Sequence, residues 1–135
     1  MTIRLATTTD LAVLAENDRH ITPANLLDAI SHNRIYIAEA DGELVGWLRY
    51  GLFWDSIPFM NMLYLLDGYR GKGYGRQLVE HWERAMAEVG HKRVMTSTQS
   101  DEFAQHFYQH MGYCVIGGFL MGDDPYEVIL VKDIG

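Results

Sequence analysis

The spacing of apolar and polar residues changes repeatedly along the chain and predicts an alternation of strands and helices. Short runs that are apolar, or that alternate apolar with polar residues, indicate strands, and apolar residues recurring every three or four positions indicate helices. The expected strands cover residues 3–6, 35–40, 44–53, 60–66, 93–98, 114–120 and 126–132. Helical spacing occurs at Leu11, Leu14 and Ala15, at Leu26, Leu27 and Ile30, at Leu78, Val79, Trp82, Met86 and Val89, and at Ala104, Phe107, Tyr108 and Met111. The pattern predicts an α/β fold.

Several residues are well placed to begin or end these helices. A hydroxyl or carboxylate within residues 7–10 can cap the first helix, and Thr22 followed by Pro23 is typical of a helix start. Gly90 suits the end of the long central helix. Ser100 is expected to cap the last helix.

Turn signals separate the early elements. Asp41-Gly42 predicts a hairpin turn between the second and third strands, and residues 54–58 interrupt the pattern before the fourth strand. The segment between the first two helices contains the polar residues Glu16, Asp18 and His20. We expect this segment to be a solvated loop.

A glycine-rich segment joins the fourth strand to the central helix and predicts a binding site. It reads Arg70-Gly71-Lys72-Gly73-Tyr74-Gly75-Arg76. Glycines let the backbone turn tightly and approach a ligand, so several amide N–H groups can point into one concavity at the start of a helix. The helix dipole and the three basic side chains add positive charge there. The segment therefore predicts an anion-binding site.

The glycine spacing fits neither of two common phosphate-binding motifs. A Walker A loop needs Ser or Thr after Gly-Lys, but Gly73 follows Lys72 here. A Rossmann fingerprint needs Gly-x-Gly-x-x-Gly, whereas these glycines alternate at positions 71, 73 and 75. An unrelated nucleotide-binding protein is therefore disfavoured.

Two motifs resemble those of the GNAT superfamily of acyl-CoA-dependent N-acyltransferases. Arg70, Gly73 and Gly75 match the family's pyrophosphate-binding signature, Arg-x-x-Gly-x-Gly. Further along the chain, residues 101–113 resemble the family's late helix, usually written Asn-x-x-Ala-x-x-Phe-Tyr-x-Lys-x-Gly-Phe. The matching positions are Ala104, Phe107, Tyr108, Gly112 and, conservatively, Tyr113, whereas Asp101 and His110 depart from the pattern.

The resemblance extends over nearly the whole chain and implies both fold and activity. The implied fold is a single GNAT-like domain over residues 1–135, with a mixed, mostly antiparallel sheet of about seven strands flanked by helices. The implied activity is transfer of an acetyl group from the co-substrate acetyl-CoA to a primary amine of a small molecule or peptide. The amine would attack the thioester directly in a ternary complex.

The resemblance also implies roles for individual residues. Residues 70–76 would bind the cofactor pyrophosphate, and Asp101 would also contact the cofactor. Backbone groups of Leu63 and Leu65 would bind the pantetheine arm like an added strand. Tyr108 would contact the cofactor and protonate the departing thiolate as a general acid. As side chains, Leu63, Leu65 and Tyr108 are equally explained by packing in the core.

The general base that many family members carry has no counterpart in this sequence. Those members place a glutamate nine or eleven residues before the motif arginine, and the corresponding positions are Asn61 and Phe59. Asp67 lies only three residues before Arg70, too near the phosphate end of the site, and the next carboxylate upstream is Asp55. Our hypothesis is that Asp55 orients or deprotonates the acceptor amine. The alternative is a turn residue, a position that Asp favours.

Charge and composition narrow the choice of partners. Apolar residues make up 48% of the chain and charged residues 21%, which is typical of a globular domain. Eleven Lys and Arg against eighteen Asp and Glu give a net charge of −7, so a nucleic acid partner is not expected. Six of the eleven basic residues lie between positions 70 and 93, as a site for a phosphorylated cofactor would require.

Neither a metal site nor a membrane segment is expected. His106 and His110 are four residues apart on one helix, but no third ligand at a recognisable spacing accompanies them. Cys114, the only cysteine, is expected to be buried at the start of a strand. Because the sequence shows no leader and no apolar run approaching 18 residues, we expect a cytoplasmic protein without a membrane partner.

An alternative from another functional class stays open. A CoA-binding module without transferase activity, acting as a sensor or a structural subunit, would keep residues 70–76 but lack a working base and acid. The sequence does not name the acceptor amine. It is compatible with a homodimer but does not fix the oligomeric state.

Overall fold

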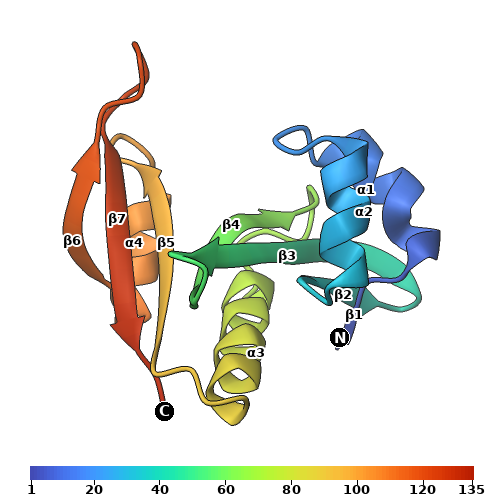
Figure 1. The fold of residues 1–135 in the computed structure, drawn as a ribbon. Coiled ribbons are helices and arrows are strands. Elements are labelled where there is room, and N and C mark those ends of the chain that lie inside the picture. The colour runs from blue at the N-terminus through green and yellow to red at the C-terminus, as the bar shows by residue number, and fades with distance from the viewer. The chain divides into compact units, whose positions relative to one another are not determined.

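The computed structural model describes residues 1–135 and contains the predicted alternation of strands and helices (Figure 1). In chain order the elements are β1 (Thr2–Leu5), the 3₁₀ helix η1 (Thr8–Asp10), α1 (Leu11–Asn17), α2 (Pro23–Ser31), β2 (Ile35–Ala40), β3 (Glu43–Phe53), β4 (Ile57–Leu65), α3 (Tyr74–Glu88), β5 (Arg93–Gln99), α4 (Ala104–His110), β6 (Cys114–Phe119) and β7 (Glu127–Asp133). The largest difference from the predicted strand bounds is at β4, which begins at Ile57 instead of Met60.

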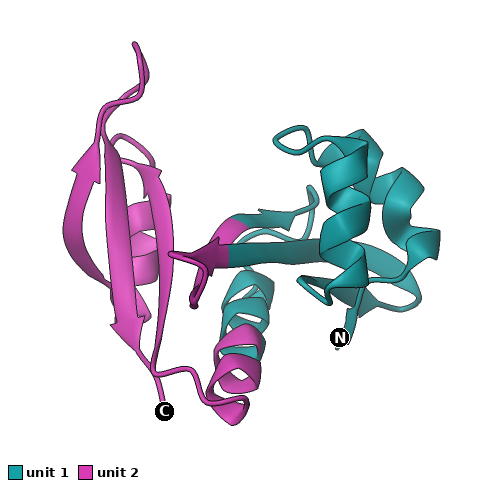
Figure 2. Ribbon diagram, in the orientation of Figure 1, with its two compact units in different colours: residues 1–51, 62–81 teal, residues 52–61, 82–135 magenta.

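The strands form one seven-stranded sheet in the order β1-β2-β3-β4-β5-β7-β6. Strands β1 and β2, β2 and β3, β5 and β7, and β6 and β7 pair antiparallel, whereas β4 and β5 pair in parallel. This confirms the predicted α/β fold with a mixed, mostly antiparallel sheet. The chain divides into two compact units, unit 1 with Met1–Gly51 and Met62–His81, and unit 2 with Leu52–Asn61 and Trp82–Gly135 (Figure 2).

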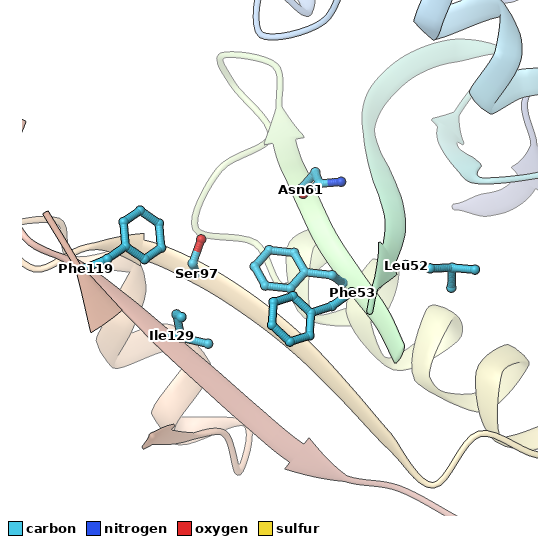
Figure 3. Close-up of a pocket in the computed structure, with 7 residues that line it drawn as sticks. Leu52, Phe53, Asn61, Ser97, Phe119 and Ile129 are labelled. Atoms are coloured by element: carbon cyan, nitrogen blue, oxygen red, sulfur yellow. The ribbon is translucent and has the colours of Figure 1, made fainter. Parts of the chain in front are cut away.

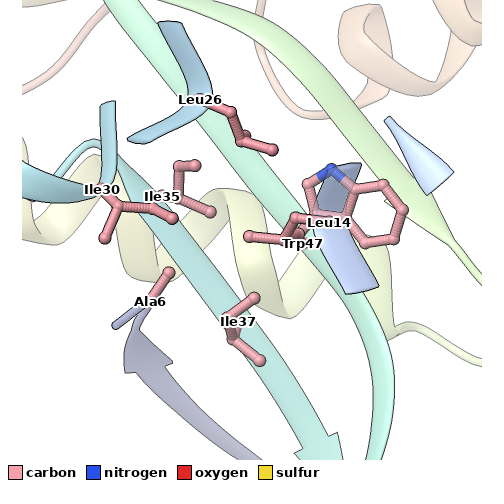
Figure 4. Close-up of a cluster of buried hydrophobic side chains, with 7 residues drawn as sticks. All are labelled: Ala6, Leu14, Leu26, Ile30, Ile35, Ile37 and Trp47. Carbon is pink, nitrogen blue, oxygen red and sulfur yellow. The ribbon is translucent and has the colours of Figure 1, made fainter. Parts of the chain in front are cut away.

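Strand β2 is buried on both faces within unit 1, since its first four residues are apolar or aromatic. Successive side chains of a strand point to opposite faces. Ile35 and Ile37 join a core cluster that also contains Ala6, Leu14, Leu26, Ile30 and Trp47 (Figure 4). The Tyr36 ring lies 5.2 Å from the His81 ring of α3. Helices α1 and α2 therefore pack on one face of β2, and the first half of α3 packs on the other.

A buried ion pair joins the loop between α1 and α2 to β3. The Asp18 carboxylate accepts hydrogen bonds from Arg49 Nε at 2.8 Å and from Trp47 Nε1 at 3.4 Å. Asp18 is 1% exposed and Arg49 is 6% exposed. The expectation of a solvated loop is therefore wrong at Asp18, because Arg49 compensates its charge inside the core. Glu16 and His20 are exposed, as expected.

Helix α3 is followed by Gly90, as predicted. Gly90 has a φ of +98°. Its N–H donates to the Ala87 carbonyl at 3.0 Å, and the His91 N–H donates to the Met86 carbonyl at 3.1 Å, which is the pattern of a glycine helix cap.

No helix of the structure has both the length and the apolar character needed to cross a membrane.

In unit 2, α4 packs against β5. Glu83 of α3 bonds the side chain of Tyr113, which directly precedes β6, and that of Lys132 on β7. The Tyr113 hydroxyl donates to Glu83 Oε2 at 2.7 Å, and Lys132 Nζ donates to Glu83 Oε1 at 2.9 Å. Burial and the adjacent Glu83 carboxylate raise the pKa of Tyr113 above its usual range, so the hydroxyl stays a hydrogen-bond donor. The buried carboxylate thereby fixes the chain just before β6 to β7.

Three smaller expectations are wrong. Ser100 does not cap α4, which begins after a turn and has Phe103 at its N-cap without a side-chain hydrogen bond. Leu27 points to solvent, although Leu26 beside it is buried. Cys114 is exposed, because it opens β6, an edge strand that pairs only with β7.

Replacing Asp18 with alanine should lower the free energy of unfolding by about 3–5 kcal/mol, since it leaves the Arg49 guanidinium buried without its partner. Asp28→Ala is the matched control, because Asp28 forms an exposed pair with His32 at 3.5 Å and should contribute little. Urea unfolding of both variants measures the difference. Equal losses would show that the buried pair does not stabilise the fold.

Candidate active site

The glycine-rich turn between β4 and α3 lies in unit 1 and leaves its backbone open to a ligand. Gly71 and Gly73 have φ values of +73° and +86°, in the left-handed region that favours glycine. A Cβ at either position would meet no atom within 4 Å. The backbone conformation therefore favours glycine at both positions, and the absence of neighbouring atoms lets a ligand approach closely.

Helix α3 begins directly after this turn. The Gly73 carbonyl accepts a hydrogen bond from the Gln77 N–H at 3.1 Å, so the first N–H groups of the helix belong to Tyr74, Gly75 and Arg76. Such groups have no partner within a helix, and the helix dipole adds partial positive charge at the same end. The turn therefore presents several amide donors to an anion.

The Arg70 side chain is held against the end of β4. Its Nε donates to the Leu65 carbonyl at 3.1 Å, and its guanidinium lies 5.3 Å from the centre of the Tyr64 ring. Arg70 Nη1 lies 3.6 Å from Asp67, in an exposed pair that contributes little. The bond through Nε attaches the guanidinium to the end of β4, and the side chain stays 58% exposed.

Two further basic side chains of the turn are exposed. Arg76 Nε lies 3.7 Å from Glu80 Oε1, one turn along α3, and Lys72 is at the surface. Arg70, Lys72 and Arg76 therefore supply three positive charges within seven residues. The composition of this segment is that of a site for a multiply charged phosphate group.

Leu63 and Leu65 lie on β4, and both are half-buried. The β4 backbone is held by β3 in this region, where the Leu66 N–H donates to the Val45 carbonyl at 2.8 Å. Gly46 of β3 permits this close approach, since a side chain there would collide with the Tyr64 carbonyl. The binding of a pantetheine arm by Leu63 and Leu65 stays a prediction.

Tyr108 lies on α4 in unit 2 and is 7% exposed. Burial raises the pKa of Tyr108 to about 12, although the Thr96 side chain acts in the opposite direction. Thr96 is itself fixed, because its hydroxyl donates to the Met60 carbonyl at 3.0 Å. Tyr108 is therefore protonated at neutral pH.

Asp101 is exposed in the turn before α4.

Asp55 lies in the tight turn that joins β3 to β4. Trp54 and Asp55 both have left-handed backbones, with φ values of +54° and +61°, and the Ser56 N–H donates to the Phe53 carbonyl at 3.2 Å. Both residues are exposed. The predicted break in the chain is thus a hairpin turn, and the turn role of Asp55 is confirmed. Its role as a base stays a prediction.

Unit 2 contains a pocket of about 390 Å³ (Figure 3). Its lining residues come from five strands and are Leu52, Phe53, Phe59, Asn61, Ser97, Phe119 and Ile129. Phe59 and Asn61 occupy the positions at which many GNAT members carry a glutamate. Neither Tyr108 nor Asp55 is among these seven residues.

Sequence reasoning singled out two of the seven lining residues, Phe59 and Asn61, and missed the other five. Ser97, Phe119 and Ile129 lie on strands separated by up to 32 positions from one another. Their only common signal is that the strand pairing places them on one face, which needs the register of β5, β6 and β7. Asn61 and Phe59 were found because their spacing from Arg70 could be counted.

Cys114, His106 and His110 are the remaining candidate groups. Cys114 lines a second hollow of about 320 Å³ together with Gly112, Ile116, Val131, Lys132 and Asp133. His106 and His110 are exposed. No three His, Cys, Asp or Glu side chains are grouped so that they could hold a metal ion.

Comparison with known proteins supports the sequence resemblance. The chain is similar to an uncharacterized N-acetyltransferase of Chlorobaculum tepidum, with 29% identity over 85 residues, and the match spans 62% of this chain but only 52% of that relative. Among solved structures, Ard1 from Thermoplasma volcanium aligns with 99% of this chain and 97% of its own, with a TM-score of 0.86 and 17% identity. The PaiA N-acetyltransferase of Thermoplasma acidophilum, solved with coenzyme A, aligns with 98% of both chains, with a TM-score of 0.81 and 20% identity.

These structural likenesses confirm the predicted GNAT-like fold, although identities this low bear on fold alone. The family evidence comes from the sequence itself. The model of the acetyltransferase (GNAT) family matches residues 5–113, which include both the glycine-rich turn and the late helix. The chain therefore belongs to the GNAT acetyltransferase family.

Proposed function

We propose that this chain is an N-acetyltransferase that moves the acetyl group of acetyl-CoA to a primary amine of a small molecule or peptide. The observation that carries the proposal is the turn at residues 70–76, where two left-handed glycines open the backbone directly before α3. The amine would attack the thioester directly in a ternary complex. Membership of an acetyltransferase family supports the same activity.

The residues of the turn fit the pyrophosphate of a CoA thioester. The amide groups at the start of α3 and the three basic side chains can bond its oxygens, and Arg70 is pre-positioned by the Leu65 carbonyl. Backbone groups of Leu63 and Leu65 would bind the pantetheine arm, and Asp101 would contact the cofactor elsewhere. The binding of coenzyme A by the PaiA neighbour is consistent with this assignment.

Tyr108 is proposed to assist the departing thiolate. An ordinary thiol has a pKa of about 8.5, well below the value of about 12 for Tyr108. Complete proton transfer from Tyr108 to the thiolate would be unfavourable by roughly 5 kcal/mol. Tyr108 is therefore better suited to donate a hydrogen bond to the developing negative charge than to supply the final proton.

A CoA-binding module without transferase activity is the second candidate. It is favoured by one observation, which is that Asn61 and Phe59 occupy the positions of the missing glutamate and cannot accept a proton. The two functions differ in one measurable respect. Both bind acetyl-CoA, but only a transferase consumes it when an amine is added.

Acetyl-CoA should raise the melting temperature, because a ligand at 100 times its dissociation constant stabilises the folded state by about 2.7 kcal/mol. Gly73→Asp should abolish this shift, since it places a carboxylate where phosphate oxygens are expected. Gly42→Asp is the matched control, because Gly42 also has a positive φ, +77°, and open surroundings but lies in another turn. A full shift in Gly73→Asp, or an equal shift with ATP in the parent, would contradict the assignment.

Tyr108→Phe should lower kcat about 10²- to 10³-fold, the range for loss of one hydrogen-bond donor to a developing negative charge, and leave the acetyl-CoA thermal shift intact. Steady-state kinetics with urea unfolding as a parallel measurement separates catalysis from stability. Tyr126→Phe, at an exposed position of the same unit, should leave kcat unchanged. If both variants keep the parental kcat, Tyr108 is a packing residue only.

Asp55→Asn tests the proposed base through the pH dependence of kcat/KM. An alkyl amine with a pKa near 10.4 is neutral in about one molecule in a few thousand at pH 7, so a base should matter most there. The variant should be slow at neutral pH and approach the parent as pH nears the pKa of the amine. Asp41→Asn is the control, because Asp41 is also exposed with a left-handed backbone. Parallel pH profiles of Asp55→Asn and the parent would exclude Asp55 as the base.

A further inference from the structure

The pocket of unit 2 is lined without a single ionisable side chain. Five lining residues are apolar, namely Leu52, Phe53, Phe59, Phe119 and Ile129, and the other two, Asn61 and Ser97, are polar but uncharged. A pocket of about 390 Å³ with mostly apolar walls and a few polar groups is typical of a small-molecule site. In a chain with 29 Asp, Glu, Lys and Arg residues, this absence of charge restricts what the pocket can bind.

The strand pairing explains why the pocket is open. Ser97 of β5 pairs with Ile129 of β7, and Ile129 pairs in turn with Gly117 of β6. A Cβ at Gly117 would meet no atom within 4 Å, so the sheet surface beside Ile129 is unfilled. Phe119, two residues beyond Gly117, contributes the aromatic wall (Figure 3). Because these residues lie on paired strands, the shape of the pocket is fixed by the sheet.

The two polar side chains come from neighbouring positions of β4 and β5. These strands pair in parallel at Phe59 with Met95 and at Met60 with Thr96, and Asn61 and Ser97 are the next residue on each strand. An amide and a hydroxyl can both donate and accept hydrogen bonds. Together they suit one neutral polar group, such as an amide, next to an apolar substituent.

We infer that this pocket receives an uncharged, apolar or aromatic substituent of the acceptor amine, with Asn61 and Ser97 bonding a neutral polar group beside it; the inference rests on the proposed function. Asn61, one of the lining residues, precedes Leu63 on β4 by two residues. Leu52, Asn61 and Phe119 are exposed, so a charged substituent would lose only part of its hydration, but it would gain no opposite charge from the lining residues. Acceptors with acidic or cationic side chains should therefore be poor substrates.

The experiment compares acceptors that share one reacting amine. The amides of phenylalanine, leucine, aspartate and lysine all present an α-amino group, whose pKa is about 7.7–8.0 in peptides. Only acetylation at this nitrogen is counted, because lysine amide also carries an ε-amine, and mass spectrometry of fragmented products distinguishes the two sites. We expect kcat/KM for the phenylalanine and leucine amides to exceed that for the aspartate and lysine amides at least tenfold. Calorimetric titration of each amide into the protein saturated with coenzyme A should give the same order of affinities.

Asn61→Asp places a carboxylate in the pocket with almost no change in volume and should shift the preference toward the lysine amide at least tenfold. Asn25→Asp, at an exposed position of α2, should leave the preference unchanged. Equal kcat/KM values and equal affinities for all four amides would overturn the inference while the proposed function stands. The inference would also be overturned, and the proposed function kept, if Asn61→Asp changed only the use of longer acyl-CoA thioesters. The pocket would then hold the acyl chain of the thioester. Absence of any acetyl-CoA binding would instead refute the proposed function. The affinities of the four amides would then be compared in titrations of the protein without coenzyme A.

Discussion

The left-handed backbone at Gly71 and Gly73 is the constraint on which the proposed cofactor site depends. Phosphate oxygens can reach main-chain amides only where no side chain intervenes, and both glycines adopt conformations that other residues disfavour. The same turn directs the chain into α3, so the first amides of the helix follow at once. Arg70 attaches the turn to the end of β4, because its Nε donates to the Leu65 carbonyl.

Charge is distributed unevenly between the two candidate binding regions. The turn at residues 70–76 concentrates three basic side chains, as a polyanionic cofactor requires. The pocket of unit 2 has no ionisable lining residue. This difference fits a protein that binds one highly charged substrate and one neutral substituent. It also explains why a single carboxylate substitution in the pocket should change which acceptors are used.

The sequence predicted what local rules determine and missed what depends on pairing between distant strands. Helix starts and ends such as Thr22 and Gly90 follow from capping chemistry, and the glycine spacing from Arg70 identified the cofactor turn. Asp18 could not be placed, because its burial depends on Arg49, 31 residues away on β3. Ser97 and Ile129 were missed for the same reason, since their proximity arises from the β5–β7 register. The prediction that Cys114 is buried rested on the usual preference of cysteine for the core, but Cys114 is exposed because β6 is an edge strand.

The central claim is that the acetyl group passes from the thioester to an amine. Incubating the protein with acetyl-CoA carrying an isotopically labelled acetyl group and with phenylalanine amide, followed by mass spectrometry, tests it directly. The account predicts one labelled N-acetyl amide for each coenzyme A released, with no label retained on the protein. Release of coenzyme A with the label recovered as acetate, or no release at all above the rate without protein, would contradict it.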